Sequence, residues 1–96
     1  MNIEPFKIEI PQSSLDDLQR RLAVIRWPED ADNNDWRYGT PRAYLEELID
    51  YWQHTYDWRK HEAAMNALPH FKTEIDGYPI HYIHVRGKGP KPLPVI

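Results

Sequence analysis

The fold of this chain is decided by the stretch FKTEIDGYPIHYIHV, residues 71–85. Asp76-Gly77 separates two runs of strand-forming residues, and this dipeptide favours a two-residue type I′ turn, in which both central residues take positive φ. Pro79 has no N–H to donate, so it must lie at the start of its strand or on the side that is not hydrogen-bonded. The stretch therefore predicts a β-hairpin with strands at residues 71–75 and 78–85.

The N-terminal part of the chain predicts a short edge strand followed by a helix. Residues 6–10 alternate apolar and charged side chains, which is the pattern of a half-buried strand, and Pro11 closes them. Ser13 or Ser14 can cap the helix that follows, and Pro28 ends it. One face of this helix carries apolar residues at helical spacing. They are Leu15, Leu18, Leu22 and Ile25.

The middle of the chain predicts a long loop and two further helices. Residues 27–40 are acidic and contain aromatic side chains, and a loop of this length is usually packed by its own side chains or used by a partner. Thr40-Pro41 is a strong helix start, and the helix is expected to run to about Tyr56. One face of this helix is expected to carry Leu45, Leu48, Ile49, Trp52 and Tyr56. Asp57 can cap a short helix that Pro69 closes. These elements place a helical region between the first strand and the hairpin.

Composition excludes several classes of function. The 96 residues are 41% apolar and 28% charged, which is ordinary for one small globular domain. The net charge of -3 gives no basic footprint for nucleic acid, and the absence of cysteine rules out disulfides and thiolate metal sites. No 18-residue apolar stretch and no basic-then-apolar start occur, so we expect neither a membrane-spanning segment nor secretion.

The residues that could carry chemistry do not form a recognisable site. His81 and His84 are three apart in a predicted strand, so they point to opposite faces and cannot share a metal ion. Residues 30–34 open like a calcium loop, but Asp35 stands where glycine is needed and Pro41 where a glutamate belongs. A glycine-rich phosphate loop and a nucleophile elbow are both missing. We therefore expect no catalytic residue, no metal ligand and no cofactor in this chain.

The last residues, LPVI at 93–96, form an apolar run with strand character after the loop at residues 87–92. A strand buried in a parallel sheet reads as such a run. We expect it to be the first part of a strand that needs neighbours, and the chain to be the front piece of a larger protein.

Several short motifs, taken in their order, resemble the N-terminal region of microsomal-type epoxide hydrolases, which belong to the α/β-hydrolase superfamily. The motifs are RWP at 26–28, WRYGT at 36–40, YDWR at 56–59, FKTEIDG at 71–77 and IH at 80–81. The resemblance covers about the whole chain, which ends just before the position of the family's His-Gly-Trp-Pro oxyanion-hole motif. It implies an α+β fold, with a small helical segment at residues 1–70. Residues 71–96 would supply a β-hairpin and the first strands of a truncated α/β-hydrolase sheet.

The resemblance also implies a function. The family opens an epoxide by attack of an aspartate, and a histidine then activates the water that hydrolyses the resulting ester. Those groups follow later in the parent sequence, so the 96-residue chain alone is expected to be inactive although the parent would be an epoxide hydrolase. The chain would be a non-catalytic packing segment whose partners are the remaining hydrolase core and lid, with self-association as a further expectation. The membrane anchor of some relatives is missing here, so the resemblance also implies a cytoplasmic location.

Aromatic residues are the candidates for contact with such a partner. They are Trp27, Trp36, Tyr38, Trp52 and Trp58. Aromatic side chains dominate internal cores as well as interfaces, so Trp52 and Trp58 fit either role. The alternative function is a free-standing interaction or ligand-binding module that uses the aromatic loop at residues 27–40.

Overall fold

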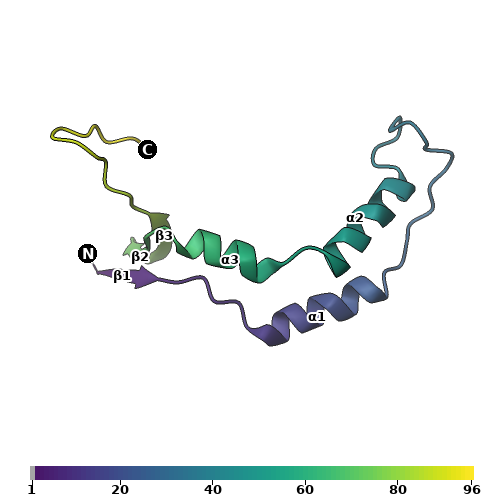
Figure 1. Cartoon of the computed structure of the whole chain (residues 1–96), viewed down its shortest axis with the longest axis horizontal. Coiled ribbons are helices and arrows are strands. Elements are labelled where there is room, and N and C mark those ends of the chain that lie inside the picture. The colour runs from purple at the N-terminus through teal and green to yellow at the C-terminus, as the bar shows by residue number, and fades with distance from the viewer. Residues whose placement is uncertain (1) are drawn as a thin grey trace. The chain divides into compact units, whose positions relative to one another are not determined.

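The computed structural model describes residues 2–96, which form three helices and a three-stranded antiparallel sheet (Figure 1). The elements in chain order are β1 (Ile3–Phe6), α1 (Gln12–Ala23), α2 (Arg42–His54), α3 (Trp58–Asn66), β2 (His70–Ile75) and β3 (Tyr78–Ile83). This arrangement confirms the α+β class expected from the sequence.

The elements belong to two compact units. One unit joins the residues up to Glu9 with Trp58–Ile96, and so contains the sheet and α3. The other unit is Ile10–Asp57, in which α2 lies antiparallel to α1 (Figure 1). The expected boundary at residues 70/71 lies at the start of β2, and as a domain boundary it stays a prediction.

The hairpin of β2 and β3 confirms the first prediction from the sequence. Ile75 pairs with Tyr78, and the two turn residues Asp76 and Gly77 have φ values of 52° and 82°. The next pair, which includes Pro79, is of the type that makes no hydrogen bonds, so the proline nitrogen faces the open edge of β3. The second strand ends at Ile83 rather than at residue 85. β2 is the central strand, with β1 on its other side.

Replacing Gly77 with valine is expected to lower the free energy of unfolding by about 1–3 kcal/mol, because a β-branched residue resists positive φ. The space around Gly77 is open, so the cost comes from backbone conformation and not from a clash. Urea unfolding of Gly77→Val and Gly77→Asn measures the effect, since asparagine tolerates the left-handed region. Equal stability of the two variants would contradict this account.

The first strand lies earlier in the chain than expected. The sequence placed it at residues 6–10, but β1 is Ile3–Phe6 and pairs with β2 from Ile3↔Thr73 to Phe6↔His70. Beyond Phe6 the backbone turns to another partner. The N–H of Ile8 donates to Oδ1 of Asn66 at 2.9 Å, and Nδ2 of Asn66 donates to the carbonyl of Ile8 at 2.7 Å. A side chain on α3 therefore takes the hydrogen bonds that a neighbouring strand would have made.

The helix starts also differ from the expected caps. α1 begins at Gln12 with Pro11 in the cap position, so Ser13 and Ser14 lie inside the first turn and neither caps it. α2 begins after Pro41, and Thr40 makes no side-chain cap; instead the N–H of Arg42 donates to Oδ2 of Asp30 at 2.7 Å. In both helices an extended proline leads directly into the first turn, which is the conformation that its fixed φ favours.

Candidate protein interface

The loop between α1 and α2 has a defined conformation held by one buried amide. Asn33 is 4% exposed; its Nδ2 donates to the carbonyl of Gly39 at 3.0 Å, and its Oδ1 accepts from the N–H of Tyr38 at 3.3 Å. The N–H of Gly39 also donates to the carbonyl of Trp36 at 3.1 Å. These bonds close the loop around its own side chain.

The same loop exposes two of the three aromatic residues that the sequence singled out in it. Trp36 takes a φ of 67°, which is unusual for a bulky residue, and its ring packs 4.9 Å from that of Tyr44 on α2. Tyr38 is 72% exposed. Both side chains are thus held on the surface of their unit.

Helix α2 continues this surface with a stripe of exposed apolar side chains at helical spacing. Its members are Tyr44, Leu48, Tyr51 and Trp52. The sequence identified Leu48 and Trp52, but it placed them on one face with Leu45 and Ile49, which are half-buried. The sequence did not identify Tyr44 and Tyr51 as part of this stripe. Both sides of α2 carry apolar residues, and only the contact with α1 shows which side stays exposed.

The remaining two candidates, Trp27 and Trp58, make polar contacts inside their own units. The guanidinium of Arg42 lies 5.7 Å from the centre of the Trp27 ring, beside a shallow hollow. The indole N–H of Trp58 donates to Oε2 of the buried Glu62 at 3.1 Å, and Arg59 binds the other oxygen at 2.7 Å. Their part in contact with a partner stays a prediction.

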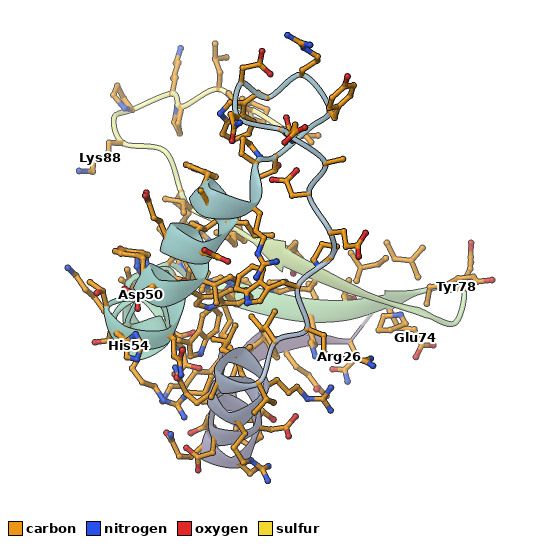
Figure 2. The ribbon with its side chains drawn as sticks, turned by 90° about the vertical axis from the view of Figure 1, so that its right-hand side faces the viewer. Arg26, Asp50, His54, Glu74, Tyr78 and Lys88 are labelled. Atoms are coloured by element: carbon orange, nitrogen blue, oxygen red, sulfur yellow. The ribbon has the colours of Figure 1, made fainter. Side chains whose placement is uncertain are left out.

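The sheet presents a second apolar surface, which the sequence did not identify. Side chains on one face of a sheet alternate along each strand and align across strands. From the register, one face carries Ile3, Pro5, Phe71, Thr73, Ile75, Tyr78, Ile80 and Tyr82, which we name the apolar sheet face. Its residues Ile3, Ile75, Tyr78 and Ile80 are exposed, and Figure 2 shows Tyr78 projecting beside the hairpin turn near Glu74.

The apolar face of α1 is only partly covered within its unit. Leu22 is buried, whereas Leu15 and Leu18 are half-buried, as is Ile25 just beyond the helix.

Two titratable side chains of α2 form an exposed pair. In α2, Nδ1 of His54 lies 3.0 Å from Oδ1 of Asp50, one helical turn away on an exposed surface (Figure 2). This pair orients an imidazole in solvent. Within residues 2–96, no group of three or more histidine, aspartate or glutamate side chains could hold a metal ion. In the same range, every helix is too short or too polar to cross a membrane.

The helices and the sheet match part of the α/β-hydrolase fold of solved epoxide hydrolases. The family model described as the epoxide hydrolase N terminus matches residues 3–96, so the chain belongs to this family. A protein of Stigmatella aurantiaca (strain DW4/3-1), provisionally assigned as an epoxide hydrolase, is 48% identical over 98% of this chain and 21% of its own length. Epoxide hydrolase 1 of Oryctolagus cuniculus is 40% identical over 96% of this chain and 22% of its own length.

Solved structures agree with this assignment. The epoxide hydrolase of Aspergillus niger matches 86% of this chain and 22% of its own with a TM-score of 0.80 and 31% identity. The juvenile hormone epoxide hydrolase of Bombyx mori matches 94% of this chain and 24% of its own with a TM-score of 0.83 and 27% identity. The chain thus spans about a fifth of the length of the curated relatives it matches.

Proposed function

We propose that this chain is the non-catalytic packing segment of an epoxide hydrolase, with the hydrolase core and lid of the same enzyme as its partners. The observation that carries the proposal is the apolar surface that the chain leaves open on the sheet and on α2. A free domain of this size would bury such side chains, because each is worth about 1.5–3 kcal/mol when removed from water.

The reaction of the whole enzyme would be the addition of water to an epoxide. A carboxylate would attack one epoxide carbon and break its bond to oxygen, giving an ester that water then hydrolyses to the diol. We assign no residue of this chain to that reaction. The chain would instead cover the hydrolase core and keep the edge of the core's sheet out of solvent. We propose a cytoplasmic location for the enzyme.

The proposal is tested with a hybrid in which this chain replaces the matching fifth of the Stigmatella aurantiaca relative. We expect the hybrid to be soluble and to unfold in one cooperative transition, because the open apolar faces find their partner. The isolated chain should also show an unfolding transition in urea, but it should self-associate or bind a hydrophobic dye because these faces stay open. It should also form no diol from styrene oxide above the uncatalysed background; diol formation that a point substitution in the chain abolishes would refute the proposal.

The second candidate function is an independent interaction module that uses the aromatic loop at residues 27–40. It is favoured by one observation, the buried amide of Asn33 that fixes the loop with Trp36 and Tyr38 exposed. A compact monomer that unfolds cooperatively by itself and binds no dye would support this alternative over the packing segment.

A further inference from the structure

His70 joins the end of α3 to the hairpin. It is the first residue of β2 and is only 6% exposed. Its Nε2 lies 2.6 Å from the carbonyl oxygen of Met65, in the last turn of α3. A carbonyl can only accept, so Nε2 must carry the proton, and in the neutral ring Nδ1 is left with a lone pair.

That lone pair faces a second histidine. Nε2 of His81, on β3, lies 3.0 Å from Nδ1 of His70, and the two ring planes are 14° apart. The ring of Phe6 packs edge-on against His81 with 4.9 Å between centroids, which fixes the imidazole from the side of β1. Only one proton can lie between Nδ1 of His70 and Nε2 of His81. In the neutral pair this proton is on Nε2 of His81, which donates a hydrogen bond to Nδ1 of His70.

The charged groups around the pair come from every neighbouring element. On the same face of the sheet are Glu4 of β1 and Lys72 and Glu74 of β2; Lys72 lies directly opposite His81, with its ammonium 4.1 Å from the centre of the Phe6 ring. On α3, His61 and Glu62 lie one turn before Met65, and Glu62 binds Trp58 and Arg59. The direct cross-strand neighbour of His81 is therefore the cation Lys72.

We propose that His70 and His81 form an acid-sensitive latch between α3 and the hairpin, which holds through one added proton and opens with the second. The first proton adds to Nδ1 of His81, and Nε2–H of His81 still donates to His70, now as a charge-assisted bond. A second proton can only go to Nδ1 of His70. Two N–H groups would then face each other, so the bond breaks and α3 loses its tie to β3.

The direction of the pH effect follows from counting protons. In the unfolded chain each of the two histidines takes up a proton near pH 6.5, whereas the hydrogen-bonded geometry of the latch leaves a place for only one added proton. The unfolded state then binds about one proton more than the native state, so stability falls as the pH falls below that value. Above about pH 7.5, where free histidine is neutral, the latch contributes its full hydrogen bond.

The test uses the whole chain and two substitutions. His81→Gln keeps a bond at any pH, because the glutamine amide can turn either its NH₂ or its carbonyl toward His70. His84→Gln is the matched control, since His84 is exposed and follows β3 directly. Urea unfolding between pH 8 and pH 4.5 should show that His81→Gln removes about one proton from the pH dependence of stability, while His84→Gln does not. An unchanged dependence in His81→Gln would overturn the proposal.

A second measurement needs no variant. Imidazole ¹⁵N spectra report the protonation of each ring nitrogen, and at pH 7.5 they should show His70 protonated at Nε2 and unprotonated at Nδ1. Loss of that state should coincide with loss of amide protection in β3. Charging of both His70 and His81 with β3 still protected would show that the two rings do not share a proton, as would signals at pH 7.5 equal to those of the urea-unfolded chain.

Discussion

Replacing Asn66 with alanine is expected to lower the free energy of unfolding of the chain by about 2–4 kcal/mol. The side chain makes two hydrogen bonds to the backbone of Ile8, and both are partly buried. Alanine can replace neither, so the N–H and the carbonyl of Ile8 lose their partners at the same time. An unpaired buried polar group costs about 1–3 kcal/mol, and here there are two. Urea unfolding followed by circular dichroism measures the change.

Two further variants test whether the loss of stability comes from the two hydrogen bonds of Asn66 to Ile8. Asn66→Asp keeps an acceptor for the N–H of Ile8 but sets a carboxylate oxygen against its carbonyl, so it should be destabilised nearly as much. Asn34→Ala removes an exposed amide and should change stability by less than about 0.5 kcal/mol. If Asn66→Ala unfolds no more easily than Asn34→Ala, the bonds to Ile8 do not hold α3 to the N-terminal segment.

Elements fixed by neighbouring residues could be predicted from the sequence. The hairpin depends on Asp76-Gly77 alone, because the turn needs positive φ at two adjacent residues and the strands follow from it. The three helices could also be predicted from apolar periodicity and proline, although α1 and α2 both end earlier than expected, at Ala23 and His54.

Elements fixed by distant residues could not be predicted in this way. Residues 6–10 do alternate as a strand would, but the backbone of Ile8 forms its hydrogen bonds with the side chain of Asn66, 58 residues away, and not with a neighbouring strand. The N–H at the start of α2 goes to Asp30 in the loop, a partner 12 residues away that no local capping rule indicates. In both cases a side chain far along the chain replaces the local partner.

The candidate interface shows the same division. Trp36, Tyr38 and Trp52 could be identified from residue type, and the structure places them at the surface. The apolar sheet face could not be identified, because it depends on the register that brings Ile80 of β3 opposite Thr73 of β2. His81 likewise has no partner at metal-ligand spacing in the sequence, yet the hairpin sets it against His70.

Replacing Ile80 with lysine is expected to leave the stability of the isolated chain nearly unchanged but to destabilise the hybrid with the Stigmatella aurantiaca relative strongly. Ile80 is 39% exposed on the apolar sheet face, so in the isolated chain lysine stays in water and stability should change by less than about 0.5 kcal/mol. If the hydrolase core covers this face, as we propose, the hybrid must bury an ammonium group without a partner. Breaking charge balance in a buried site costs about 3–5 kcal/mol, which is a large part of the stability of a folded domain.

Pro79→Lys is the matched control, because residue 79 is the exposed neighbour of Ile80 on the opposite face of β3 and lies across from Glu74. Lysine there should leave both the isolated chain and the hybrid folded, since it gains an opposite charge and stays in water. Unfolding curves of the four proteins measure the difference. Equal tolerance of Ile80→Lys and Pro79→Lys in the hybrid would show that the apolar sheet face remains open in the whole enzyme. The packing of this chain would then rest on the stripe of α2 and its aromatic loop.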